Sequence, residues 1–400
     1  MLIISAVFPP EPVVSATLSH DLAMALKENY EVTVLSPAPS RPYGFNHRQN
    51  ARIPLAFNHI ILPSYVCPQS SVIGRFRESY SFGKATERYI HEHHQKIDRI
   101  YANTWPLFAQ YFAIKAAKRY HLPIVLHVQD IYPESLANKL PLIGTLVNYL
   151  LRPMDAWILR NTTKVIAISE KMKDYLVNTR NLNPSHVEVV TNWQDEQPFL
   201  NLQQNNLSAG KDDSFTFMYL GNIGPVAGCD LLIDAFNSLQ NTNTRLVIAG
   251  SGSMKDQLIK QVSDQKINNV EFWSVPDGQV PAIQSKADIL LLPVKKGSAS
   301  TSIPSKLPAY MFSAKPIIAA VDYDSDTANA IQVSGCGWVI EPESSDILTQ
   351  VMKDVMVLDK RQLNEIGLKG RNYALIKFSK QSNLSKLVSI VERLLSQNFR

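Results

Sequence analysis

The chain has 400 residues, of which 45% are apolar and 19% are charged. These fractions exclude a disordered chain, and the length exceeds what one hydrophobic core usually serves, so two domains are expected. The net charge of +5 lies in the first half: residues 1–195 hold 20 Lys and Arg against 15 Asp and Glu, and residues 196–400 hold 20 of each. A basic half could bind an anionic membrane or an anionic acceptor. A mildly basic, solvated surface explains the charge equally well.

The cysteines and the first residues indicate a cytoplasmic chain. Cys67, Cys229 and Cys336 lie far apart in sequence, so neither a disulfide framework nor a zinc site is predicted. Residues 1–8 are apolar but lack a basic leader, and they predict a core strand rather than a signal peptide. No apolar run reaches the roughly 18 residues that a membrane-spanning helix needs. Peripheral contact with the inner face of the plasma membrane stays open.

Short apolar runs alternate with helix-length stretches through the first half. Strands are predicted at residues 2–8, 31–36, 59–63, 99–102, 124–128, 164–168 and 187–190, and helices at 15–29, 71–96, 106–120 and 170–178. Continuous apolar strands separated by helices are typical of a parallel sheet covered on both faces. The first half is therefore expected to be a doubly wound α/β domain.

The second half repeats the alternation after a polar stretch at 195–214, which is the best candidate for a linker. Strands are predicted at 215–220, 245–249, 270–272, 289–293, 316–320 and 337–340, and helices at 230–240, 254–265, 280–286, 304–312 and 325–333. Two Rossmann-like, doubly wound parallel-sheet domains follow. Because such sheets bind ligands at the carboxyl ends of their strands, we expect the two sheets to face a cleft.

Two glycine turns follow neighbouring strands of the second half. Gly221 and Gly224 come after the strand at 215–220, and Gly250 and Gly252 come after the next strand. Glycines at such positions let backbone amides approach a phosphate at a helix N-terminus. The alternative is a tight strand–helix turn that needs positive φ. Neither turn completes GxGxxG, so the dinucleotide fingerprint is not present.

Polar side chains also follow two other predicted strands. Asp130 and Glu134 come directly after the strand at 124–128, where a general base or a hydroxyl ligand would sit. The alternative makes Asp130 a cap of the next element or a partner in a surface ion pair. Ser305 and Lys306 begin a predicted helix after Pro304, where they could bind a diphosphate. The alternative there is an ordinary cap with a solvated lysine.

Two other stretches invite a functional interpretation. His91, His93 and His94 lie in a segment rich in Lys and Glu, which is typical of a solvated helix face, so no metal site is predicted. Residues 141–151 are apolar and of helix length. A buried core helix is the favoured interpretation, and an interfacial membrane helix stays open.

The ordered motifs of the chain resemble glycosyltransferase family 4, a retaining family with the GT-B fold. The resemblance is carried by residues 8–12 (FPPEP), 129–135 (QDIYPES), 167–173 (AISEKMK), 190–193 (VTNW), 221–224 (GNIG), 250–252 (GSG), 287–288 (AD) and 304–306 (PSK). The DIYPES and PSK pieces look most like the bacterial branch that transfers N-acetylated aminodeoxyhexoses in surface-polysaccharide assembly.

The resemblance implies a separate function for each part of the chain. Residues 1–195 would bind the acceptor, residues 196–378 the nucleotide-sugar, most simply a UDP-sugar, and residues 379–400 would form a helix crossing back. The acceptor would be lipid-linked or an oligosaccharide, with no metal, no cofactor and no nucleic acid. The implied residues are Asp130 and Glu134 for catalysis, Gly221, Asn222, Gly224, Gly250, Ser305 and Lys306 for the donor, and Val14, Ser15 and Gln129 in the acceptor-side loop.

The chain departs from the family pattern at several functional positions. The family's glycine pair falls on Val13 and Val14, its phosphate-binding Arg and Lys on Asn222 and Ala227, its histidine on Gln129, and its two glutamates on Thr301 and Ala309. Lys306 is then the natural substitute for the lost positive charge. Two alternatives remain: a GT-B-fold sugar-nucleotide epimerase, and a catalytically inactive, donor-binding partner subunit.

Overall fold

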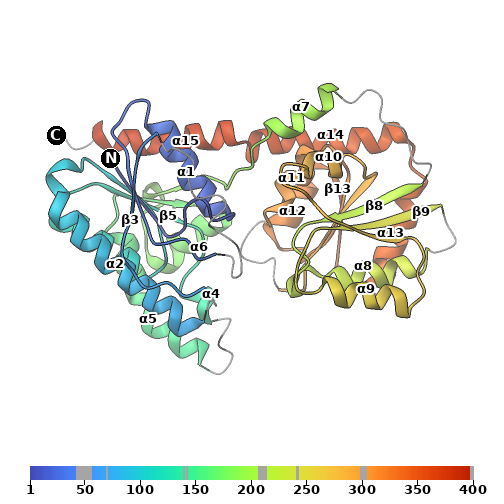
Figure 1. The fold of residues 1–400 in the computed structure, drawn as a ribbon, viewed down its shortest axis with the longest axis horizontal. Helices are drawn as coiled ribbons and strands as arrows, with labels where there is room; N and C mark the ends of the chain where they lie inside the picture. The colour runs from blue at the N-terminus through green and yellow to red at the C-terminus, as the bar shows by residue number, and fades with distance from the viewer. Residues whose placement is uncertain are drawn as a thin grey trace. The chain divides into compact units, whose positions relative to one another are not determined.

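The chain divides into two compact units, one formed by Met1–Asn192 with Asn383–Arg400 and the other by Trp193–Ser382. The computed structural model, shown in Figure 1, describes residues 1–41, 56–68, 71–137, 140, 143–205, 214–239, 243–297 and 304–396. Each unit is built around one parallel sheet. None of the helices among these residues has the length and apolar character needed to cross a membrane.

The first unit contains a seven-stranded sheet in the order β3-β2-β1-β4-β5-β6-β7. Its strands are β1 (Leu2–Ser5), β2 (Thr33–Ser36), β3 (Asn58–Ile61), β4 (Ile100–Asn103), β5 (Ile124–Val128), β6 (Lys164–Ala167) and β7 (Val187–Val189). Leu2 pairs with Thr33 on one side and with Ile100 on the other. The strand order therefore reverses between β1 and β4, which is where open α/β sheets bind ligands.

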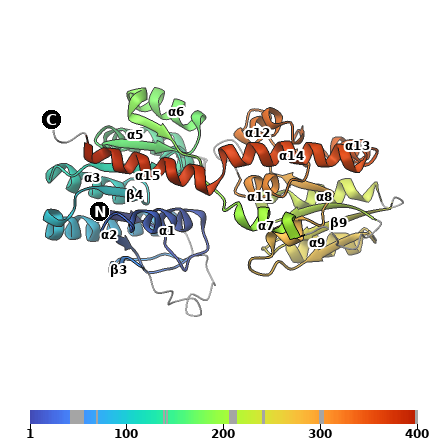
Figure 2. The same cartoon turned by 90° about the horizontal axis from the view of Figure 1, so that it is seen from above.

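Helices cover both faces of this sheet. They are α1 (Val14–Leu26), α2 (Val72–His93), α3 (Phe108–Arg119), α4 (Glu134–Ala137), α5 (Gly144–Arg160) and α6 (Glu170–Arg180). One hydrophobic core joins the strands to α2, α3, α5 and α6 through residues such as Phe82, Ala113, Ile158 and Leu176. The α1 helix and the last part of α15 (Lys380–Ser396) cover the other face (Figure 2).

The second unit contains a six-stranded parallel sheet in the order β10-β9-β8-β11-β12-β13. Its strands are β8 (Phe215–Leu220), β9 (Thr244–Ala249), β10 (Val270–Trp273), β11 (Ile289–Pro293), β12 (Ile317–Ala320) and β13 (Gly337–Ile340). Its helices are α7 (Gln197–Asn205), α8 (Cys229–Asn237), α9 (Lys255–Asp264), α10 (Val280–Gln284), α11 (Lys306–Phe312), α12 (Asp326–Ser334), α13 (Ser345–Met356), α14 (Lys360–Lys377) and the start of α15. A hydrophobic core lies on each face.

The fold confirms the predicted class and all thirteen predicted strands. The linker prediction at 195–214 is wrong in its first part, because α7 begins at Gln197. Phe199 of this helix is 4% exposed and packs on Phe312 with ring centroids 5.9 Å apart. A helix with a buried aromatic side chain thus lies in a stretch that its polar composition assigns to a linker. Residues 206–213 lie outside the described part of the chain.

One titratable side chain lies in the middle of the first sheet. His127 on β5 is 1% exposed, and its Nδ1 lies 2.7 Å from the hydroxyl oxygen of Tyr101 on β4. Its Nε2 has no hydrogen-bond partner among the described residues. Burial lowers the pKa of His127 to about 3, so the ring is neutral in the folded chain.

We expect the first unit to lose stability as the pH falls from about 7 to about 5. The unfolded chain protonates His127 near a pKa of about 6.5, whereas the folded chain keeps the ring neutral until about pH 3. Because the folded-state pKa is the lower one, this stability is complete above about pH 6.5 and is lost as the pH falls toward 3. The loss is roughly 2 kcal/mol between pH 7 and 5, measurable by urea unfolding.

Two variants test whether His127 causes this pH dependence. The double variant His127→Leu with Tyr101→Phe removes the ring and its partner, and its stability should change less with pH. The matched control is His121→Asn, because His121 is exposed and should leave the pH dependence unchanged. A parent chain that is equally stable at both pH values would contradict the prediction.

Candidate functional site

The two glycine turns of the second unit pack directly against each other. The Ile223 amide donates to the Ser251 carbonyl oxygen at 2.8 Å. A Cβ on Gly250 would overlap the Gly221 carbonyl oxygen, and a Cβ on Gly252 would overlap the Ile223 carbonyl oxygen. Only glycine lets the ends of β8 and β9 meet backbone against backbone. This contact explains the glycines by itself, so the case for a ligand depends on the side chains around them.

Lys306 lies across the first of these turns. It begins α11, and a Cβ on Gly221 would overlap its Cε. Its Nζ donates to the Tyr219 hydroxyl at 2.6 Å and lies 4.6 Å from the centroid of that ring. Burial lowers the pKa of Lys306, and no carboxylate of the described residues interacts with it. A half-buried ammonium with no carboxylate partner is a group that an anionic ligand would complete.

The other predicted donor residues lie around this lysine. Asn222 is exposed, and its carbonyl oxygen accepts from the Tyr219 hydroxyl at 2.6 Å. Ser305 is exposed at the start of α11 and makes no capping hydrogen bond with its side chain. Gly224 is buried. The structure therefore brings Gly221, Asn222 and Lys306 together at the end of β8.

Two of the positions where the family carries other charged groups are buried alanines here. Ala227 is 5% exposed and Ala309 is 8% exposed, and Thr301 lies outside the described residues. The residue after Ala309, Tyr310, binds the end of β8 instead. Its hydroxyl accepts from the Leu220 amide at 2.8 Å and donates to the Leu220 carbonyl oxygen at 3.0 Å. This part of α11 therefore fixes the strand end and adds no charge to it.

A second lysine that the sequence analysis did not single out reaches the same turns. Lys255 begins α9, and its Nζ donates to the Gly250 carbonyl oxygen at 3.3 Å. Side chains point back toward the N-terminus of a helix, so a lysine at the first helical position reaches the strand end before it. The spacing of Lys255, five residues after Gly250, is the signal that could have identified it.

In the first unit, Asp130 is exposed directly after β5. The side-chain oxygen of its neighbour Gln129 accepts from Asn192 Nδ2 at 2.8 Å. Gln129 Nε2 and Asn192 Oδ1 are both buried and have no partner among the described residues. Two amide groups beside Asp130 thus have unused hydrogen-bonding capacity at the carboxyl edge of the sheet. Sequence reasoning did not propose Asn192, which follows β7.

Glu134 has a different environment from Asp130. Its carboxylate accepts from Arg180 Nη2 at 2.6 Å and from the Tyr175 hydroxyl at 2.9 Å. Arg180 is fully buried, and it also donates to the Tyr132 carbonyl oxygen at 3.0 Å and to Asp155 at 2.6 Å. Burial opposes ionisation of Glu134, yet Arg180 holds its pKa below the ordinary value. A carboxylate held by a guanidinium is a weak proton acceptor.

The two predicted carboxylates therefore have different environments. Glu134 and the Tyr132 carbonyl anchor the loop after β5 to Arg180, at the end of α6. Asp130 lies within that loop, between this anchor and the Gln129–Asn192 hydrogen bond. We interpret Glu134 as a residue that holds the loop, and Asp130 is an exposed carboxylate directly after the strand.

The predicted acceptor-side residues Val14 and Ser15 start α1 after β1. Val14 is 41% exposed, and the Ser15 carbonyl oxygen accepts from Asn103 Nδ2 at 3.3 Å. The loop before them is fixed by Glu11, whose carboxylate accepts from the Ser40 amide at 2.8 Å. The loops after β1, β2 and β5 thus present Val14, Ser15, Gln129 and Asp130 at the same edge of the sheet.

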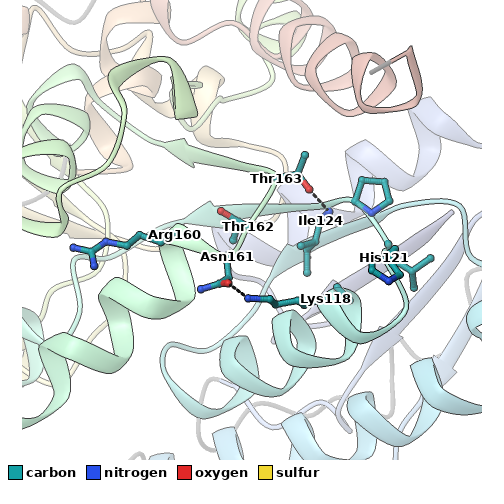
Figure 3. A pocket seen from close by; sticks show the side chains of 10 residues that line it. Lys118, His121, Ile124, Arg160, Asn161, Thr162 and Thr163 are labelled. Atoms are coloured by element: carbon teal, nitrogen blue, oxygen red, sulfur yellow. Dashed lines mark hydrogen bonds between the residues drawn. The ribbon is translucent and has the colours of Figure 1, made fainter. Parts of the chain in front are cut away.

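Figure 3 shows a pocket of about 530 Å³ in the first unit, and none of the predicted site residues lines it. Lys118 donates to the Asn161 side chain at 2.6 Å, and Arg160 lies nearby on α5. The pocket lies where β5 and β6 begin, at the edge opposite to the one that binds ligands in open α/β sheets. Since α3 and α5 end here, we interpret the two cations as partners of the helix C-termini.

The three histidines pack against tyrosines. His91 and His94 contact Tyr120, and the rings of His94 and Tyr120 are stacked with centroids 4.1 Å apart. His93 stacks on Tyr89 at 4.2 Å. In the described part of the chain, no group of three His, Cys, Asp or Glu side chains is placed to hold a metal ion.

Comparisons with known proteins identify the class of protein. The model of Glycosyltransferase Family 4 matches residues 15–197, and that of Glycosyl transferases group 1 matches residues 203–372. The chain is 23% identical over 290 residues to the probable glycosyltransferase WbjE of Pseudomonas aeruginosa, covering 68% of this chain and 69% of that one. It is 25% identical over 341 residues to the putative colanic acid biosynthesis glycosyl transferase WcaI of Escherichia coli, covering 82% of each chain.

Solved structures agree on the fold. HepE of Anabaena in complex with UDP superposes with a TM-score of 0.72 at 15% identity, covering 98% of this chain and 99% of that one. Sucrose-phosphate synthase of Thermosynechococcus elongatus also gives 0.72, at 14% identity over 99% of this chain and 98% of that one. The two family models together span most of the chain, so it belongs to glycosyltransferase family 4 and has the GT-B fold.

Proposed function

We propose that this glycosyltransferase moves a sugar from a UDP-linked donor to a lipid-linked or oligosaccharide acceptor in the assembly of a bacterial surface polysaccharide. The proposed sugar is an N-acetylated hexosamine or deoxyhexosamine, transferred with retention and without a metal ion. The observation that carries the proposal is Lys306, a half-buried cation with no carboxylate partner in the described chain, placed across a glycine turn at a strand end. The names of WcaI and of the HepE complex support the substrate classes by analogy.

The chemistry proposed for each unit follows from its side chains. In the second unit, Lys306, Lys255 and the amides of the glycine turns would offset the charge of a diphosphate without a metal ion. In the first unit, Asp130 would accept a proton from the acceptor hydroxyl or orient it. The amide groups of Gln129 and Asn192 would hold a hydroxyl of the acceptor.

One observation favours a second candidate. The buried Ala309 occupies the position of a family glutamate, and this loss is compatible with a donor-binding subunit that has no activity of its own. A third class, a sugar-nucleotide epimerase, would act on the same donor without an acceptor. Both alternatives keep the donor site and differ from a transferase only in the product.

A nucleotide-sugar screen followed by product analysis tests the proposal. A UDP-sugar at a hundredfold excess over its Kd stabilises the folded chain by about 2.7 kcal/mol, which should raise the melting temperature of the second unit by roughly 5–10 °C. UDP-N-acetylhexosamines should give the largest shift in a panel that includes GDP- and ADP-sugars. Incubation of the best donor with polyprenyl-diphosphate-linked saccharides should then give a lengthened lipid-linked product.

The outcomes separate the three classes. A shift without any product indicates the inactive subunit, and a changed sugar without an acceptor indicates the epimerase. If no uridine nucleotide changes the melting temperature, the donor assignment is wrong.

A further inference from the structure

Tyr219 connects Lys306 to the first glycine turn. It lies in β8, just before Gly221, and its side chain is fully buried. Its hydroxyl donates to the Asn222 carbonyl oxygen at 2.6 Å and accepts from Lys306 Nζ at 2.6 Å. Both directions are fixed, because an ammonium can only donate and a carbonyl oxygen can only accept. The single proton of the phenol is thus used on the turn, and a lone pair of its oxygen holds the lysine.

Lys306 reaches Tyr219 from the opposite face of the sheet. Side chains of a strand alternate between the two faces. Met218 and Leu220 belong to the hydrophobic core that contains α11, whereas Tyr219 belongs to the core that contains α8. Because Lys306 begins α11, its side chain crosses the end of β8 to place its ammonium 4.6 Å from the centroid of the Tyr219 ring. Ordering such a flexible stem costs conformational entropy, which the contact with Tyr219 offsets.

The path of the lysine also accounts for the glycine at position 221. The atoms nearest to a Cβ placed on Gly221 are Cε, Cδ and Nζ of Lys306, and the Cβ would overlap Cε. A side chain at this position would therefore push the lysine away from Tyr219. The space that a side chain would fill beside the turn is occupied instead by the stem of Lys306.

A second buried tyrosine at the same strand end has a purely structural set of contacts. The Tyr310 hydroxyl makes both of its hydrogen bonds to the backbone of Leu220. Tyr219 makes one hydrogen bond to the backbone and one to a cation. That cation has no carboxylate partner among the described residues. An ammonium that is bound only by a hydroxyl and an aromatic ring keeps its charge available for an anionic ligand.

We propose that Tyr219 is a positioning residue of the donor site, whose hydroxyl holds the Lys306 ammonium over the Gly221 turn for the diphosphate of the donor. The same hydroxyl binds the Asn222 carbonyl oxygen and so turns this oxygen away from the phosphates. The inference rests on the proposed function, which assigns Lys306 to the diphosphate, and it names the residue on which that assignment depends. Tyr219 and Lys306 then act as a unit, so that removing the lysine also removes the effect of the hydroxyl.

A double-mutant cycle of UDP affinity, measured by isothermal calorimetry on the full chain, tests this dependence. Tyr219→Phe removes only the hydroxyl and should lower the affinity about fivefold, because the released lysine has to be ordered when the diphosphate binds. Lys306→Ala should lower the affinity at least tenfold. In the Lys306→Ala background, Tyr219→Phe should lower it by less than about twofold, since there is no lysine left to position.

Two further variants make the cycle specific. Tyr310→Phe is the matched control, because it removes a buried hydroxyl from the same strand end, and any loss of affinity should be equal with and without Lys306. Gly221→Ala displaces the lysine without altering Tyr219, so it replaces Tyr219→Phe if that variant does not fold. It should lower the affinity several-fold in the parent chain and much less in the Lys306→Ala background, where the overlap is relieved.

The pH dependence of UDP affinity separates positioning from a loss of structure. Burial lowers the pKa of Lys306, and a hydroxyl that accepts from the ammonium favours its charged form. Binding that needs the ammonium is complete below the pKa of Lys306 in the free protein and is lost as the pH rises through it. Tyr219→Phe should move this loss to lower pH, Tyr310→Phe should not, and Lys306→Ala supplies the baseline. Cys229 on α8 also acts on Lys306, but burial raises its pKa to about 12, so the thiol stays neutral.

Two outcomes would overturn this proposal and leave the proposed function intact. One is a Tyr219→Phe variant that binds UDP as tightly as the parent chain while Lys306→Ala binds it more weakly. The other is a loss caused by Tyr219→Phe that is equally large in the Lys306→Ala background. If Lys306→Ala itself binds UDP as tightly as the parent chain, the donor assignment of the proposed function is wrong, and the positioning role of Tyr219 is wrong with it.

Discussion

Replacing Asp130 by Asn is expected to lower the rate of sugar transfer about a hundredfold or more, while donor affinity stays within a few-fold. A positioned general base contributes about 10²–10⁴-fold, and Asp130 is the exposed carboxylate of its loop, since Glu134 is bound by Arg180. Asparagine keeps the shape and removes the charge. Initial rates with the donor found in the nucleotide screen, together with calorimetry of UDP binding, measure the two quantities separately.

Two further variants make the Asp130 result specific. Glu134→Gln should lower the rate far less, because an amide still accepts the Arg180 hydrogen bond and the loop stays anchored. Asp174→Asn is the matched control, an exposed carboxylate on α6 of the same unit, and it should have no effect. If the leaving phosphate accepts the proton, Asp130 only orients the acceptor and the loss is nearer tenfold. Near-normal turnover of Asp130→Asn would remove this residue from the mechanism.

The fold could be predicted because its strands are buried on both faces. Such strands are continuous apolar runs, and the predicted limits of residues 124–128, 215–220 and 289–293 coincide with β5, β8 and β11. Helices held by few apolar contacts were harder to predict. Helix α7 is fixed by Phe199 within a polar stretch, and α5 extends to Arg160 because Ile158 and Leu159 enter the core well beyond the predicted apolar stretch.

The candidate site could be predicted only where its residues follow strands of the sheet, because the carboxyl ends of parallel strands meet at one edge. Gly221 and Lys306 are far apart in sequence, but they follow β8 and β11, which are neighbours in the sheet, so topology brings them together. The role of Glu134 could not be predicted, because its partner Arg180 is 46 residues away at the end of α6. A sequence shows that a carboxylate follows a strand, but not which cation reaches it.

Replacing Lys306 by Ala is expected to lower the affinity for UDP at least tenfold. A charge-assisted contact contributes about 1.5–3 kcal/mol, and each 1.4 kcal/mol is a tenfold change in affinity. Lys306 is held over the Gly221 turn by the Tyr219 hydroxyl at 2.6 Å and has no carboxylate partner among the described residues. An incoming diphosphate would therefore not compete with an existing ion pair, so the full contact energy is available. Isothermal calorimetry of the folded variant measures the change.

A neutral variant of Lys306 and a control lysine elsewhere in the unit separate the effect of the Lys306 charge from the effect of its packing. Lys306→Met keeps most of the side-chain volume over Gly221 and should lose nearly as much affinity as Lys306→Ala, because the ammonium is the group that meets the phosphate. Lys296→Ala is the matched control, an exposed lysine of the same unit. If both Lys306 variants are folded and bind UDP as tightly as the parent chain, the turn amides and Lys255 bind the donor without Lys306. Lys306 would then be a lysine that packs against Tyr219, and the donor site would have to be assigned from Lys255 and the two glycine turns alone.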